Sequence, residues 1–241
     1  MMSKAVSPDQ VNESILSRRW RKFKTLKRGY YSLVILSCLY GISFFLPFLI
    51  NNRALVVKYH GEYYFPVLSG YTPGKQFGQD VPGDTRYRKL KVQFKEQNEE
   101  DSWVWMPPYP YSPYEDITFE GNKPYEPPSR THWLGTDNTG RDVFARLCYA
   151  FNISISFALL LTIINYIIGV LIGGTMGYYG GKFDLFFQRL IEIWSSLPML
   201  FVIIILSSIL KPSFLLLISI YTLVNWISMT YLMRAEFYRE K

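Results

Sequence analysis

Cysteine and histidine are scarce in this chain, with two residues of each among 241. Cys38 and Cys148 lie in or beside apolar blocks and cannot build a disulfide framework, so we expect them to pack as small hydrophobic side chains. His60 and His132 are far apart in the sequence and stand in no metal-ligand spacing. No acid, base and nucleophile set converges elsewhere, so the sequence predicts no enzyme, no cofactor and no metal site.

Charged residues are almost absent from four apolar blocks. The blocks cover roughly residues 30–50, 153–176, 190–210 and 213–233. A helix needs about 20 apolar residues to cross a bilayer core of about 30 Å, and each block reaches about that length. The sequence therefore predicts an all-α, multi-pass membrane protein with four spans, in contact with the lipid bilayer.

The positive charge is concentrated in residues 1–29, which hold eight basic and two acidic residues. A basic flank beside a first span indicates a cytoplasmic N-terminus. A nucleic-acid partner would need basic residues on a folded face among stacking aromatics, and this arm does not offer them. We therefore expect a cytoplasmic arm at 1–29, a span at 30–50, an external insert at 51–152 and three further spans within 153–241.

The insert is rich in aromatic residues and proline. Residues 54–57 and 62–68 have strand-like composition, and the prolines between 103 and 114 exclude a helix there. The aromatic rings supply enough apolar surface to argue against disorder. We expect a small, loop-rich cap on the outer side, either as a surface that contacts solute or as a purely structural element.

A polar, glycine-punctuated run at 132–146 stands directly before the second span. Polar groups this dense are costly in lipid, so the run must lie at an interface or within protein. The charges of Asp137, Arg141 and Asp142 are close in sequence. We expect them to form hydrogen bonds within a short turn.

Polar and small residues also mark the spans. Gly169, Gly173 and Gly177 share one helix face and favour close helix packing, although a lipid-facing helix that tolerates glycine is the alternative. Asn165 and Asn225 lie in mid-span, where hydrogen bonds between helices are the first expectation and pathway contact the second.

The segment from 178 to 198 carries three further local signals. The glycines after Tyr178 break the helix there, and Asp184 is expected to cap the next one. Arg189 and Glu192 are three residues apart and can pair, with Glu192 also a candidate for the transport pathway. Pro198 removes a backbone donor and predicts a kink.

Three segments in order resemble the inner-membrane permease subunits of bacterial oligopeptide and dipeptide ABC importers. Residues 133–143 are similar to that family's LGTDxxGRDV signature. Residues 177–184 are similar to its GYxGGxxD turn, and residues 189–198 to its RxxE/DxxxSxP segment. Within the family, the aromatic insert and residues 187–195 look most like the permease of the microcin C-type peptide importer.

The resemblance implies a type I ABC permease bundle in the bacterial inner membrane. It implies three partners: a second permease subunit in a heterodimer, cytoplasmic ATP-binding subunits that hydrolyse ATP, and a periplasmic solute-binding protein. From the close charges in this turn, we expect the signature residues to buttress the outer gate. These are Gly135, Thr136, Asp137, Gly140, Arg141 and Asp142.

The end of the chain departs from the family pattern. Arg234 and Glu236 fit the lead-in to the cytoplasmic coupling loop that contacts the ATPase, but the sequence stops before that loop and two further spans. We therefore expect a C-terminally incomplete permease core. The predicted function is import of peptides or peptide-like solutes, and the alternative is a membrane-anchored periplasmic ligand sensor or scaffold without transport.

Overall fold

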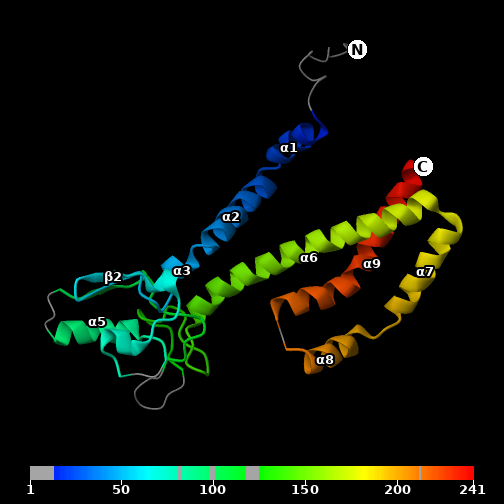
Figure 1. Cartoon of the computed structure of the whole chain (residues 1–241). Coiled ribbons are helices and arrows are strands. Elements are labelled where there is room, and N and C mark those ends of the chain that lie inside the picture. Colours follow the sequence, from blue (N-terminus) through cyan, green and yellow to red (C-terminus); the bar gives the residue numbers. More distant parts are fainter. Residues whose placement is uncertain (1–13, 81–82, 98–100, 118–124, 212) are drawn as a thin grey trace, which may run out of the picture. The chain divides into compact units, whose positions relative to one another are not determined.

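The computed structural model describes residues 14–80, 83–97, 101–117, 125–211 and 213–241. It divides into two compact units, Met1–Asn152 and Ile153–Lys241. The chain is mostly helical, and the boundary between the units falls inside its longest helix, α6 (Val143–Tyr179) (Figure 1).

The first unit begins with three helices, α1 (Ile15–Thr25), α2 (Lys27–Ser43) and α3 (Leu46–Leu49). The predicted first span at 30–50 is therefore not one helix, since it bends between α2 and α3. Helix α2 has 17 residues, which corresponds to about 25 Å at about 1.5 Å per residue.

A three-stranded antiparallel sheet follows, made of β1 (Val56–Tyr59), β2 (Glu62–Tyr64) and β3 (Trp103–Trp105) in the order β2-β1-β3. His60 and Gly61 join β1 to β2 with positive φ angles of 49° and 86°, as a two-residue hairpin turn requires. The expected strand at 62–68 is shorter, because Pro66 starts the short helix α4 (Pro66–Ser69).

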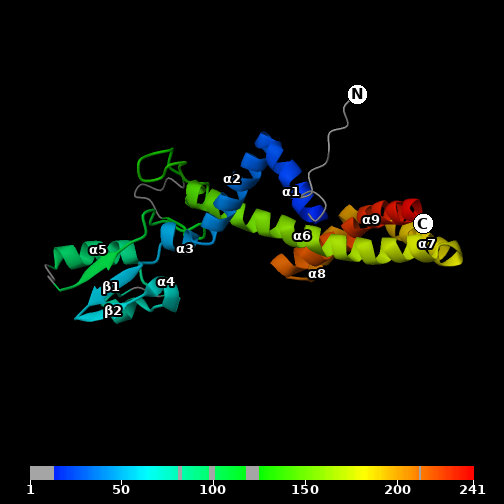
Figure 2. The same ribbon diagram turned by 90° about the horizontal axis from the view of Figure 1, so that it is seen from above.

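Helix α5 (Tyr87–Glu96) was not expected, and it shows that the insert is more than a loop-rich cap. Its residues Tyr87, Leu90 and Phe94 follow helical spacing and are all buried. They form one core with sheet residues Val57 and Val104, so α5 packs on the sheet (Figure 2). The 3₁₀ turn η2 (Gly74–Phe77) adds the buried ring of Phe77 to this core.

A second apolar cluster joins α3 to the first turns of α6. It contains Leu46, Ile50, Tyr109 and Ala145, all buried. Two hydrogen bonds add to it, from the Tyr149 hydroxyl to the Ile50 carbonyl at 2.9 Å and from the Asn152 amide to the Ser43 hydroxyl at 2.7 Å. Helix α6 thus begins ten residues before the predicted span at 153, because its first turns belong to this protein core.

The second unit contains most of α6 with α7 (Gly181–Ser195), α8 (Met199–Ile209) and α9 (Phe214–Glu240). Among the described residues, α6 and α9 are long and apolar enough to cross a membrane. A third span results if α7 and α8, which are bent by 70° at the break between them, count as one. The kink expected at Pro198 is therefore present, but it splits the predicted third span into two helices.

Candidate functional site

The signature loop between Gly135 and Asp142 is held by two glycines in the left-handed region, with φ of 71° at Gly135 and 79° at Gly140. A Cβ atom at Gly135 would lie 2.5 Å from the Glu126 carbonyl oxygen, and one at Gly140 would lie 2.5 Å from the Ile117 carbonyl oxygen. Only glycine meets both demands, of conformation and of space. The loop therefore lies tightly against backbone that precedes it in the sequence.

Asp142 is the most deeply placed polar residue of the loop, with no exposed surface. One carboxylate oxygen accepts from the Ala145 backbone N–H at 2.7 Å, which caps the start of α6. The other oxygen lies 2.7 Å from the Tyr109 hydroxyl and 2.7 Å from His132 Nδ1. This carboxylate therefore fixes the start of α6 to two segments of the insert.

The tyrosine of this group stays a hydrogen-bond donor. Burial, together with its hydrogen bond to Asp142, raises the pKa of Tyr109 well above its ordinary value. The Tyr109 ring also contacts the rings of Trp133 and Phe144, at centroid distances of 5.0 and 5.1 Å. The polar contact is thus enclosed by aromatic packing, which keeps water away from it.

We expected Asp137 and Arg141 to pair through their side chains, but they do not. Asp137 accepts hydrogen bonds from the backbone N–H groups of Thr139 and Arg141, both at 2.9 Å, and forms an ion pair with Arg146. Burial raises the pKa of Asp137, but these bonds outweigh it and hold the pKa at about 2. Arg141 instead pairs with Asp116 at 2.8 Å.

Thr136 completes the loop by pairing with the segment before it. Its hydroxyl accepts from the Glu126 N–H at 2.7 Å, and its own N–H donates to the Glu126 carbonyl at 3.0 Å. The six signature residues therefore act together as a clamp, in which backbone geometry, one ion pair to Asp116 and the buried Asp142 hold the insert to the first turn of α6.

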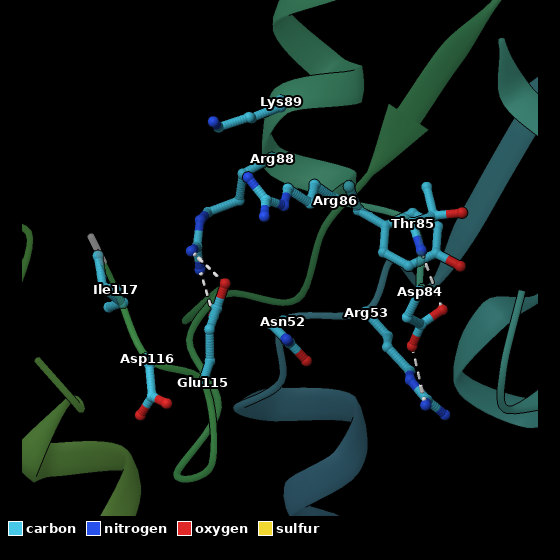
Figure 3. A pocket seen from close by; sticks show the side chains of 11 residues that line it. Asn52, Arg53, Asp84, Thr85, Arg86, Arg88, Lys89, Glu115, Asp116 and Ile117 are labelled. Atoms are coloured by element: carbon cyan, nitrogen blue, oxygen red, sulfur yellow. Dashed lines mark hydrogen bonds and ion pairs between the residues drawn. The ribbon is translucent and has the colours of Figure 1, made fainter. Parts of the chain in front are cut away.

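A polar cavity of about 350 Å³ adjoins this clamp in the first unit (Figure 3). One wall is the segment 115–117, whose Asp116 is the partner of Arg141 and whose Ile117 N–H donates to the Gly140 carbonyl at 3.1 Å. The opposite wall is the start of α5. Arg88 crosses from α5 to bind both carboxylate oxygens of Glu115, at 2.6 and 3.0 Å.

A second polar cluster lies within the other unit, around Asp184 at the start of α7. This carboxylate is 4% exposed and binds Arg234 of α9 through two N–H groups, at 2.6 and 2.7 Å. The Tyr238 hydroxyl donates to it at 3.0 Å and the Gln188 amide at 2.8 Å. The prediction that Asp184 caps α7 is wrong, because Gly180, with φ of 63°, occupies the N-cap position.

The predicted glycine face of α6 lies against α9. A Cβ atom at Gly169 would lie 2.6 Å from the side chain of Met229 in α9, and one at Gly177 would lie 2.6 Å from the side chain of Phe237. One at Gly173 would collide with the Thr230 carbonyl oxygen. Later positions in α6 contact later positions in α9. The two helices therefore run in the same direction, with their backbones close.

The other predicted positions are more dispersed. Arg189 and Glu192 pair at 2.5 Å as expected, in an exposed position. The Asn225 amide donates to the Tyr221 carbonyl of its own helix at 2.9 Å, so the expected bond between helices is not the one it makes. The buried Oδ1 of Asn165 has no hydrogen-bond partner among the described residues. Glu236 pairs with Arg239 at 2.5 Å.

The parts of the chain that the structure describes hold no group of three or more His, Cys, Asp or Glu side chains that could bind a metal ion. Sequence reasoning missed two sets of partners, Tyr109 with His132 around Asp142, and Arg234 with Tyr238 around Asp184. Only the second set could have been suggested by sequence spacing, because Arg234 and Tyr238 are four residues apart and therefore lie on one helix face.

Known proteins similar to this chain are transport proteins. Residues 169–241 match the family described as binding-protein-dependent transport system inner membrane component. The chain is 42% identical over 224 residues to the inner membrane ABC transporter permease protein YejE of Escherichia coli (strain K12), covering 92% of this chain and 64% of that protein.

Two further relatives widen the comparison. The chain is 35% identical over 251 residues to the peptidoglycan transport system permease protein YejE of Agrobacterium fabrum, covering 93% of this chain and 64% of that protein. It is 39% identical over 110 residues to the dipeptide transport system permease protein DppC of Bacillus subtilis, covering 46% and 34%. The resemblance to these permeases is confirmed, and the chain spans 64% of the length of the first two relatives.

Proposed function

We propose that this chain, whose residues 169–241 match the binding-protein-dependent transport system inner membrane component family, is a permease subunit of an ATP-driven importer. The observation that carries the proposal is the signature loop at 134–143 set before an apolar helix, in a chain 42% identical to an ABC transporter permease protein. The chain would be a transport subunit and not an enzyme, with ATP hydrolysis done by its partners.

The proposed solutes are peptides or peptide-like molecules. Relatives are named for dipeptide transport and for peptidoglycan transport, and both names point to solutes that contain short peptides. The proposed partners are cytoplasmic ATP-binding subunits, a periplasmic solute-binding protein and a second permease subunit. The name of the family, which refers to a binding protein, supports the second, and the name of the Escherichia coli relative, an ABC transporter permease protein, supports the first.

The proposed location is the bacterial inner membrane, with the basic N-terminal arm in the cytoplasm and the insert at 51–152 in the periplasm. The charge of residues 1–29 supports this orientation. In this topology both α6 and α9 run inward, which agrees with their common direction in the second unit. The signature loop then lies at the periplasmic end of α6, and Asp184 lies at its cytoplasmic end.

The mechanism that we infer contains no chemistry on the solute. A permease must have two packings of its helices that differ by a few kcal/mol, so that ATP binding in partner subunits selects between them. The clamp around Asp142 would buttress the outer gate by moving α6 together with the insert. The cluster around Asp184 would keep α7 and α9 together at the inner end, so that force on α9 reaches α7 and, through the turn at Gly180, the end of α6.

The test is uptake of a labelled tripeptide by cells that carry the proposed partners and either contain or lack this chain. Accumulation that needs ATP and this chain supports the proposal. Equal accumulation in both strains contradicts it. Binding of the tripeptide to the cell surface without accumulation would instead assign the chain to ligand sensing.

A further inference from the structure

Among the residues that the structure describes, the cavity between α5 and the segment 115–117 has an excess of unpaired positive charge. Each of its three carboxylates is already bound by an arginine: Asp84 by Arg53 at 3.0 Å, Glu115 by Arg88 at 2.6 Å, and Asp116 by Arg141 at 2.8 Å. A paired carboxylate attracts a further cation only weakly, so the net field of the cavity is set by the cations that are left over.

Two cations are left over, Arg86 and Lys89. Both line the cavity, and among the described residues neither has an acidic partner. Arg86 is the N-cap residue of α5 and Lys89 lies in its first turn, so both stand at the same end of the helix. Figure 3 shows both side chains leaving α5 on the side from which Arg88 reaches Glu115.

The backbone adds to this positive field. Helix α5 begins at Tyr87 without a side-chain cap and without an acidic residue in its first turn. The N–H groups of a first turn carry partial positive charge and have no partner within the helix. The amide of Asn52, on the cavity wall, supplies a neutral donor. The cavity thus offers two charged donors and several neutral ones to a ligand that accepts hydrogen bonds.

We propose that this cavity binds the carboxylate of a short peptide, held by Arg86 and Lys89. A guanidinium and an ammonium together match a carboxylate in charge and in hydrogen bonding. A volume of about 350 Å³ is at the lower end for small-molecule sites, which suits the end of a peptide and not a large solute. The inference rests on the proposed function, since it assigns the solute of that importer to a site on its insert.

The cavity has a structural link to the signature clamp. Arg141 holds Asp116, and the Gly140 carbonyl holds the Ile117 N–H, so the loop that caps α6 also positions one wall of the cavity. A peptide carboxylate bound at the opposite wall would therefore lie one ion pair away from the start of α6. Solute at this site would strengthen the attachment of the insert to that helix.

The experiment measures binding of tri-alanine to the full chain in lipid nanodiscs by titration calorimetry. The double variant R86Q/K89Q should weaken binding by about tenfold, which is the loss expected when a charge-assisted contact is removed. The matched control is K91Q/K95Q, which makes the same charge change on the same helix away from the cavity. Tri-alaninamide, which lacks the carboxylate, should bind the wild type about tenfold more weakly than tri-alanine does.

Four results would overturn the proposal. Equal affinities for tri-alanine and tri-alaninamide would show that the cavity does not recognise the carboxylate. An equal loss of tri-alanine affinity in K91Q/K95Q would show that the effect depends on the overall positive charge of the helix and not on the cavity. If inorganic phosphate binds as strongly as tri-alanine, the cavity is a general anion site. If R86Q/K89Q instead weakens only capture of the solute-binding protein, the cavity is a docking site for that protein. Because uptake is measured separately, failure here leaves the proposed function standing.

Discussion

Asp142 and Asp184 are both buried carboxylates close to an end of α6, but they differ in what surrounds them. The donors to Asp142 are a tyrosine hydroxyl, a histidine ring and one backbone N–H. The main donor to Asp184 is the guanidinium of Arg234, which binds it through two N–H groups. The first group fixes a helix start to a folded insert, whereas the second neutralises charge between apolar helices.

The difference is one of chemical adaptability. A tyrosine hydroxyl can accept as well as donate, and a neutral histidine can accept at Nδ1 by moving its proton to Nε2. A guanidinium can only donate. Replacement of the carboxylate by an amide should therefore be tolerated around Asp142 and not around Asp184.

The largest loss is expected from Asp142→Ala. It removes a helix cap worth about 1 kcal/mol and two buried hydrogen bonds to a charged acceptor worth about 1.5 kcal/mol each, so about 4 kcal/mol in total. Asp142→Asn should lose less than half of that, because Tyr109 and His132 can adapt to the amide. Thermal unfolding in detergent measures both. A loss in the Asn variant as large as in the Ala variant would contradict the adaptable network.

At the inner end, Asp184→Ala should destabilise the chain by about 3 kcal/mol, the lower end for breaking a buried ion pair, because Arg234 remains 27% exposed. Asp184→Asn should lose nearly as much, since its amide nitrogen turns a donor toward a guanidinium. Glu192→Gln is the control, because the Arg189–Glu192 pair is exposed and worth little. Similar losses in Asp184→Asn and Glu192→Gln would refute a special role for the inner cluster.

A smaller loss, about 2 kcal/mol, is expected from Gly173→Ala. The added Cβ would meet the Thr230 carbonyl, so α9 must move away from α6. The move also pulls Arg234 from Asp184, and we expect the losses of Gly173→Ala and Asp184→Ala to overlap when combined. Gly41→Ala in α2 is the matched control, since its Cβ meets nothing within 4 Å. Strict additivity would show that helix packing and the ion pair are independent.

The smallest effect concerns Asp137, whose pKa of about 2 is below its ordinary value of 3.8. A carboxyl with a lowered pKa in the folded state stabilises fully above about pH 4, and this contribution is lost as the pH falls toward 2. At neutral pH, Asp137→Asn should cost less than about 1 kcal/mol, since its partner Arg146 is 48% exposed. Its unfolding temperature should fall less between pH 6 and 3 than that of the wild type. Parallel pH curves would rule out the lowered pKa.

Local sequence patterns predicted the break at Pro198, the glycine face of α6 and the Arg189–Glu192 pair, because each depends on residues within a few positions. They did not predict the partners of Asp142 or Asp184. Tyr109 is 33 residues from Asp142, and Arg234 is 50 residues from Asp184, so only the tertiary fold brings them together. Helix α5 was missed because its four basic residues obscured the apolar spacing of Tyr87, Leu90 and Phe94.

The early start of α6 was missed for a related reason. The ten residues from Val143 to Asn152 include Arg146 and are less apolar than the block that follows. Composition places the start of a membrane span where the apolar run begins. A helix, however, begins where its first N–H groups find an acceptor, and that acceptor is Asp142.

The most direct test of the account is ATP-dependent tripeptide uptake by cells in which this chain is wild type, Asp142→Asn or Asp184→Asn, with membrane levels of the chain measured in parallel. The account predicts that uptake per inserted chain is largely kept in Asp142→Asn and lost in Asp184→Asn, because only the second variant breaks the ion pair that joins α7 to α9. Loss in Asp142→Asn with full uptake in Asp184→Asn would contradict it. So would full uptake in cells without the chain.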